Sequence, residues 1–231
     1  KNSLSKAVVN HTGIIEANRL SKNAKGEIIL LADMQHGTTT VSGTLKAEGK
    51  NGADGGFIET SAANIQIQDS TKVSTLSDSG KTGTWLIDPT DFTIRAGGGI
   101  WTTSSIGATT LQTNLATSSV ILQTSATNTG SEKGDINVNA AVTWTSPNSL
   151  TLSAHNDINI NANITATNGK LNLIYGTSTA NYYANTSNYY LNNGAKVNLK
   201  AGQNFSTQKG ADTARKIDYT VITDLGAAGS T

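Results

Sequence analysis

The sequence predicts an all-β protein that folds as a parallel β-helix, and three observations point to this class. The 231 residues include 34 Thr, 24 Asn, 22 Ser and 23 Gly, so small polar side chains dominate the composition. Short segments in which apolar and polar residues alternate follow one another along the chain, as in strands with one buried face. Similar segments also return at spacings of 21, 22 and 26 residues, which is typical of a solenoid.

The predicted strands are short and are separated by Gly or Asn. No window repeats apolar residues at the i, i+3, i+4 and i+7 positions of a long helix, although a short helical turn is expected near residues 109–115. The strands are expected at residues 27–31, 38–41, 57–59, 65–68, 92–94, 120–123, 135–138, 150–152, 157–160, 171–174 and 197–199.

The spacing of repeated segments favours a β-helix over a β-sandwich, which does not predict a constant offset. Residues 135–138 (DINV) return as 157–160 (DINI), 22 positions later. Residues 150–152 (LTL) return as 171–173 (LNL) after 21 positions, and again as 197–199 (VNL) after a further 26. A coil of about twenty residues holds three strands of about three to five residues each. We therefore expect about seven to nine coils, with Val, Ile and Leu inside and ladders of Asn and Thr outside.

The composition excludes several classes of function. The chain carries 17 Lys and Arg against 16 Asp and Glu, a formal net charge of +1, so it offers no basic footprint for nucleic acid. It has no Cys for disulfides or thiolate metal sites. The three His, at positions 11, 36 and 155, lack the spacing of a metal site, and no cofactor is expected. The longest apolar run, residues 28–32, is too short for a membrane-spanning helix.

Residues 175–194 are the strongest candidate for a contact with a partner. This stretch exceeds the expected coil length, so it is expected to leave the β-helix as an extrahelical loop. Four of the six Tyr, at positions 182, 183, 189 and 190, lie in it among Asn, Thr and Ser, a mixture that binding loops favour. The alternative is that these rings pack on the β-helix and cap its core. The predicted partner-binding residues are Tyr182, Tyr183, Asn185, Thr186, Asn188, Tyr189 and Tyr190.

No catalytic residues are predicted. Asp135 and Asp157 would stack one coil apart, but they follow Gly or Asn at the start of strands, where Asp commonly accepts hydrogen bonds in turns. No basic residue repeats beside them, and a β-helix alone does not imply chemistry. Gly97, Gly98 and Gly99 follow a predicted strand without opening a convincing helix, so a loop is expected there rather than a phosphate site.

A succession of motifs in residues 26–94 resembles a known family. GEIILL at 26–31 leads to VSGTLKA at 41–47, GGFIETS at 55–61 and GTWLIDPTDFTI at 83–94. This order is similar to the filamentous-haemagglutinin-like exoproteins of two-partner secretion, in which a glycine-rich coil precedes a recurrent W-L-I-D-P block. The tail YTVI at 219–222, with Leu225, resembles the family's lead into a further β-helical section.

The resemblance implies a right-handed parallel β-helix, secreted through the outer membrane to the bacterial cell surface. It implies that residues 1–231 are a single-domain fragment of a larger exoprotein, whose outer-membrane transporter is engaged by a region outside this chain. Within this family a non-enzymatic, monomeric protein that binds host haemopexin and promotes haem release is the preferred subclass. The alternatives are an adhesin for a host glycan or matrix and a β-helical carbohydrate-active enzyme, which would need a carboxylate-lined groove.

The W-L-I-D-P block also has a physical interpretation. Trp85, Leu86 and Ile87 are expected to fill the core, and Pro89 is expected to end the strand because it lacks a donor N–H. Asp88 and Asp91 are expected to accept backbone hydrogen bonds at the following corner. These roles are structural.

Overall fold

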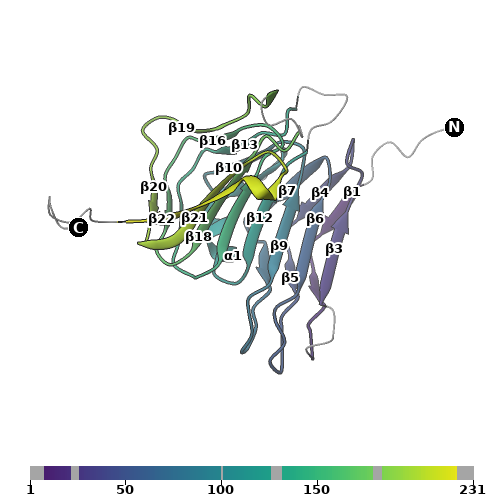
Figure 1. Cartoon of the computed structure of the whole chain (residues 1–231). Helices are drawn as coiled ribbons and strands as arrows, with labels where there is room; N and C mark the ends of the chain where they lie inside the picture. The colour runs from purple at the N-terminus through teal and green to yellow at the C-terminus, as the bar shows by residue number, and fades with distance from the viewer. Residues whose placement is uncertain (1–7, 22–25, 100, 126–131, 179–183, 223–231) are drawn as a thin grey trace.

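The computed structural model describes residues 8–21, 26–99, 101–125, 132–178 and 184–222. In this part of the chain, strands from successive coils pair side by side in parallel and form three faces around one interior (Figure 1). Face three holds eight strands, and only the last of them, β22, pairs antiparallel. The described residues therefore make seven coils, and the prediction of a parallel β-helix is confirmed.

Face one contains the first strand of each coil and one additional strand. β11 follows β10 in the sequence but lies between β7 and β10 in the sheet, so the fourth coil contributes two strands. In spatial order the strands are β1 (Val8–His11), β4 (Thr38–Val41), β7 (Asn64–Ile67), β11 (Ser105–Gly107), β10 (Phe92–Arg95), β13 (Ile136–Val138), β16 (Ile158–Ile160) and β19 (Tyr189–Leu191).

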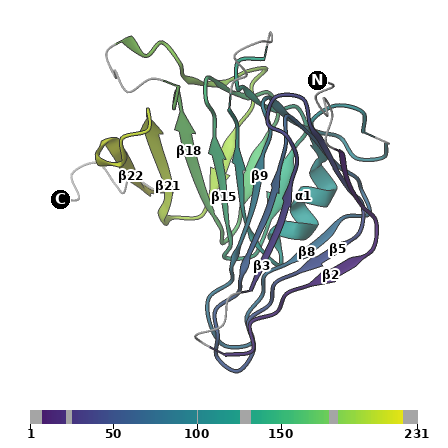
Figure 2. The same ribbon diagram turned by 90° about the vertical axis from the view of Figure 1, so that its right-hand side faces the viewer.

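Face two is interrupted by a helix. Two three-stranded sheets make up this face, and α1 (Ala108–Leu115) contacts β8 at the end of one sheet and β14 at the start of the other (Figure 2). The helix was expected near residues 109–115 and is confirmed. The strands are β2 (Ile14–Glu16), β5 (Thr44–Lys46), β8 (Lys72–Ser74), β14 (Val142–Trp144), β17 (Ile164–Ala166) and β20 (Val197–Leu199).

Face three closes each coil. A short 3-10 helix, Thr213–Arg215, connects its last two strands. The strands are β3 (Glu27–Leu31), β6 (Phe57–Ser61), β9 (Thr84–Asp88), β12 (Ser119–Gln123), β15 (Ser149–Ser153), β18 (Lys170–Tyr175), β21 (Gly202–Lys209) and β22 (Lys216–Val221).

The strand register confirms two of the three repeats and corrects the third. Ile136 pairs with Ile158, and Leu150 pairs with Leu171, as the offsets of 22 and 21 predicted. Residues 197–199, however, form β20 on face two and pair with β17, whereas the partner of Leu171 is Phe205. The prediction was wrong because an apolar-polar-apolar triplet has the same appearance on every face.

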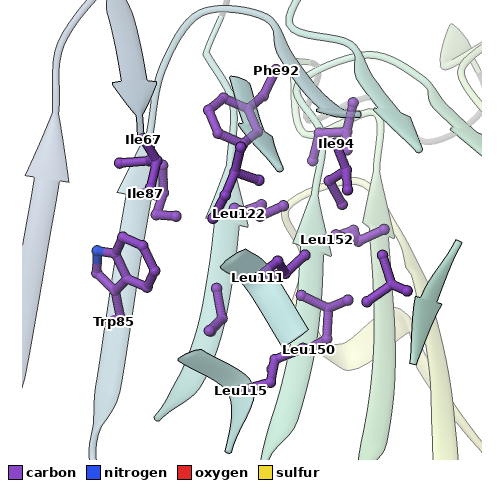
Figure 3. Close-up of a cluster of buried hydrophobic side chains, with 14 of the residues drawn as sticks. Ile67, Trp85, Ile87, Phe92, Ile94, Leu111, Leu115, Leu122, Leu150 and Leu152 are labelled. Atoms are coloured by element: carbon purple, nitrogen blue, oxygen red, sulfur yellow. The ribbon is translucent and has the colours of Figure 1, made fainter. Parts of the chain in front are cut away.

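Aliphatic side chains at alternate strand positions fill the interior, and α1 contributes Leu111 and Leu115, one turn apart (Figure 3). The outward positions carry the expected polar ladders. Asn161 donates to Asn139 at 2.7 Å, and Asn192 donates to Asn161 at 2.9 Å. Each ladder pairs carboxamides of successive coils, because strands in a sheet lie about 4.8 Å apart.

The W-L-I-D-P block is only partly as predicted. Trp85 and Ile87 are fully buried, and β9 ends at Asp88, immediately before Pro89. Leu86 instead points outward, because neighbouring side chains of a strand alternate between faces. Asp91 Oδ1 accepts the backbone N–H groups of Gly134 and Asp135 at 2.7 and 2.8 Å, as expected.

The early coils project loops that were not predicted. Residues 47–56 and 75–83 connect face two to face three and extend from one corner of the β-helix (Figure 2). Asp78 joins the two loops, since its carboxylate accepts the backbone N–H groups of Asn51 and Gly52 at 2.8 and 3.2 Å. The extrahelical material of this protein is therefore not confined to residues 175–194.

Candidate functional site

The predicted loop at 175–194 is shorter than expected. Its first residue, Tyr175, ends β18, and Tyr189–Leu191 form β19, which pairs in parallel with β16 on face one. Of the residues between these strands, the structure describes 176–178 and 184–188. Tyr182 and Tyr183, two of the predicted contact residues, lie outside the described residues.

A buried asparagine closes the base of this segment. Asn185 is 6% exposed, and its Nδ2 donates to the carbonyl oxygen of Gly176 at 2.6 Å while its Oδ1 accepts the Ser187 N–H at 3.1 Å. Gly176 has a φ of 67°, and a side chain there would collide with the Asn185 carboxamide. Asn185 was predicted to contact a partner, but its burial and its hydrogen bonds give it an anchoring role.

The pair Tyr189 and Tyr190 is divided by the pleat of β19. Tyr189 occupies the inward position, in register with Ile158, and its ring meets the Tyr175 ring edge-on at 5.4 Å. Tyr190 occupies the outward position, in register with Asn159, and is 41% exposed. The alternative interpretation, that rings of this segment pack on the core, therefore holds for Tyr189. Among the described members of the predicted set, Thr186, Asn188 and Tyr190 are exposed.

The interior of the β-helix opens toward its last coil. A groove of about 480 Å³ lies there, and Tyr189 lines it together with strands of all three faces. Its other lining residues are Leu173, Leu191, Val197, Asn198, Leu199, Phe205, Val221 and Ile222. The partly buried side chains of this coil thus end the hydrophobic core rather than form a separate pocket.

Asp135 and Asp157 form part of a hydrogen-bonded column at one corner. Asp135 Oδ1 accepts the Asp157 N–H at 3.1 Å, and Asp157 Oδ1 accepts the Asn188 N–H at 2.8 Å. Asp91 begins the column, and burial raises its pKa. These carboxylates bind backbone N–H groups of the following coil, as the turn interpretation predicted.

Asp88 lies in a different environment on the outward side of face three. Its Oδ2 accepts from Gln123 Nε2 at 3.1 Å, while its Oδ1 is buried without a hydrogen-bond partner. Burial raises the pKa of Asp88 to about 6; the Gln123 hydrogen bond opposes this shift, and the charge of Glu59 adds to it. The prediction that Asp88 accepts backbone hydrogen bonds was wrong, because its side chain points away from the corner.

Other types of site have no support in the described part of the chain. No three His, Cys, Asp or Glu side chains there are grouped so that they could hold a metal ion. No helix in the same residues is long and apolar enough to cross a membrane. Gly98 N donates to Asp69 Oδ2 at 2.5 Å, so the glycine-rich stretch is a loop held by a carboxylate, as expected.

Comparisons with protein-family models, with curated proteins and with solved structures found no match to this chain.

Proposed function

We propose that this chain is the β-helical part of a secreted bacterial surface protein that binds a host extracellular protein without enzymatic chemistry. Host haemopexin is the first candidate partner, on the resemblance to two-partner secretion exoproteins in residues 26–94. The observation that carries the proposal is the 13-residue connection between β18 and β19, whose base is fixed by buried Asn185. Loops on rigid scaffolds often carry function.

The exposed residues beside this base have suitable chemistry for a protein contact. Tyr190 offers a large ring and a hydroxyl group on the outward side of β19, with Thr186 and Asn188 nearby in the sequence. Tyr loses little conformational entropy on binding, since it has two side-chain torsions. A partner that is bound more tightly in a distorted conformation shifts toward that conformation, which would promote release of its haem.

An adhesin for a host glycan or matrix is the second candidate, and the Asn ladders of face one favour it. Asn139, Asn161 and Asn192 stack at one outward position and expose a row of carboxamides across three coils. A carbohydrate-active enzyme has less support, since the carboxylates of Asp135 and Asp157 are already engaged by backbone N–H groups.

Capture from serum tests the proposal. The immobilised chain is incubated with serum, and the bound proteins are identified by mass spectrometry. We expect haemopexin to be enriched by the wild-type chain. The enrichment should be lost in a variant with Tyr182, Tyr183 and Tyr190 changed to Ala. The matched control is Tyr219→Ala, because Tyr219 is 38% exposed, close to the 41% of Tyr190, but lies on β22. Capture that survives the triple substitution in a folded variant contradicts this assignment.

A further inference from the structure

The outward side of face three changes character along the β-helix. One register column runs through Ile29, Glu59, Leu86 and Ile121 in the first four coils. The same column continues through Thr151, Asn172 and Ser206 in the last three, where the side chains hydrogen-bond to one another as a polar ladder. A polar column is therefore compatible with this fold, and the early coils depart from it.

The departure places apolar side chains on both sides of β6, on β3 and on the pair β9 and β12. Ile29 and Leu31 on β3 are 54% and 58% exposed. Leu86 and Ile121 are direct neighbours on β9 and β12, and both are half-buried at outward positions. Single exposed aliphatic residues are ordinary, whereas a group of them on one side of a sheet is a feature of interaction surfaces.

Carboxylates are the charged groups among these aliphatic residues. Glu59 lies between Ile29 and Leu86 in register, and Asp88 follows two positions after Leu86 on the same strand. The outward positions of β3, β6, β9 and β12, all of them described, contain Glu27 as a third acid and no Lys or Arg. We call Ile29, Leu31, Glu59, Leu86, Asp88 and Ile121 the acidic–aliphatic face.

The hydrogen bonding of Glu59 leaves capacity for a cation, since its Oε1 accepts from the Ser61 hydroxyl at 2.7 Å. Asp88 Oδ2 accepts from Gln123, and its Oδ1 is buried, so Asp88 contributes negative charge beside the site. A groove of about 320 Å³, lined by Glu27 and Phe57, adjoins the starts of these strands; Arg19 also lines it and donates to the Gly55 carbonyl oxygen at 3.5 Å.

We propose that the acidic–aliphatic face docks a polypeptide segment that carries Lys or Arg among aliphatic residues. A cation between Glu59 and Asp88 would complement their charge, while the aliphatic side chains of the segment cover Leu86 and Ile121. The negative face would repel nucleic acid and anionic lipid surfaces. The outward positions of these four strands carry mainly aliphatic residues, and Phe57 is the aromatic residue among them. This composition favours a peptide over a glycan as the ligand. The proposal does not depend on the Tyr segment or on haemopexin.

The test uses a synthetic peptide of alternating Lys and Val with blocked ends, titrated into the full chain by calorimetry. The comparison ligands are the same peptide with Glu in place of Lys and a set of neutral oligosaccharides. In the main variant, Leu86→Thr and Ile121→Asn together extend the polar ladder of Thr151 and Asn172. The charge variant is Glu59→Gln. Ile174→Thr, at an outward position of β18, is the control outside the face.

The expected result is binding of the Lys–Val peptide with a Kd that rises at least about tenfold in the Leu86/Ile121 variant and in Glu59→Gln, but not in Ile174→Thr. Unfolding midpoints in urea identify any variant that has lost its fold, and Glu59→Gln keeps the test decisive because it changes only a surface charge. Equal binding of the Glu–Val peptide, an unchanged Kd in the folded variants, or preferential binding of an oligosaccharide to this face overturns the proposal.

Discussion

The backbone N–H of Asp157 donates to the carboxylate of Asp135, its counterpart one coil earlier, at 3.1 Å. The same carboxylate oxygen accepts from Asn156 Nδ2 at 2.7 Å. Two stacked Asp residues on a β-helix could be taken for a catalytic pair, and the geometry gives them a structural task instead. Each carboxylate fixes the chain at the corner where the next coil begins.

Removal of this acceptor should destabilise the fold. Asp135→Ala leaves the Asp157 N–H and the Asn156 amide without their partner, and we expect a loss of about 1–3 kcal/mol in the free energy of unfolding. Asp135→Asn keeps an acceptor and should cost less. Urea unfolding followed by circular dichroism measures both. An Ala variant as stable as the wild type would show that solvent replaces the carboxylate at this corner.

Much of this fold was predictable because a stacked coil repeats its residue pattern. Alternating segments located strands such as β3 and β4, and constant offsets placed Leu150 beside Leu171. The face of a short strand was harder to predict, since the spacing from β13 to β16 is 22 residues and that from β16 to β19 is 31. Coil length thus varies with the loops, and the sequence spacing alone does not assign residues 197–199 to a face.

The candidate site was less predictable for a related reason. The pleat alternation that identified the strands, applied to Tyr189 and Tyr190, would have placed one ring inside and the other outside. The role of Asn185 depends on a contact with Gly176, nine positions earlier, which no local pattern reveals. The acidic–aliphatic face likewise appears only when Ile29, Leu86 and Ile121 are brought into register by pairing.

Asn114 provides a second test of how the coils are joined. It lies on α1 and is 1% exposed, and its carboxamide accepts the Val73 N–H at 2.6 Å and donates to the Thr71 carbonyl oxygen at 3.1 Å. The side chain thereby satisfies the edge of β8 in place of a neighbouring strand. Asn114→Leu should cost about 2–5 kcal/mol of stability, since two buried backbone groups lose their partners.

The control for this substitution is Thr109→Ala, at an exposed position of the same helix. It should change the free energy of unfolding by less than about 0.5 kcal/mol. Both substitutions raise helix propensity, so an Asn114→Leu variant as stable as Thr109→Ala would contradict the role of the contact with β8. Hydrogen exchange at Val73 gives an independent measurement, because its N–H should become less protected only in Asn114→Leu.

Asp88 should make stability depend on pH. Its pKa in the folded state is about 6, above that of an unfolded Asp, so the folded protein binds this proton more tightly. The contribution of Asp88 to stability is therefore present below about pH 4 and is lost as the pH rises through about 6. Because the carboxyl group is partly exposed, we expect Asp88→Asn to add only about 1–2 kcal/mol at pH 7 and almost nothing at pH 4.

Urea unfolding at pH 4, 5.5 and 7 measures this effect. The difference between Asp88→Asn and the wild type should grow across that series. A constant difference at all three pH values would mean that the substitution alters packing or hydrogen bonding and that the proton on Asp88 is not linked to folding.

Two glycines at the same corner of successive coils should respond oppositely to Ala. A Cβ on Gly43 would lie 2.1 Å from the carbonyl oxygen of Gly13, whereas a Cβ on Gly13 would meet no atom within 4 Å. Gly43→Ala must therefore push the first coil away, at a cost of about 1–3 kcal/mol. Gly13→Ala meets open space and restricts the unfolded chain, so it should stabilise the protein by about 0.4–1 kcal/mol. Urea midpoints that move in the same direction for both variants would contradict close stacking of the coils as the cause.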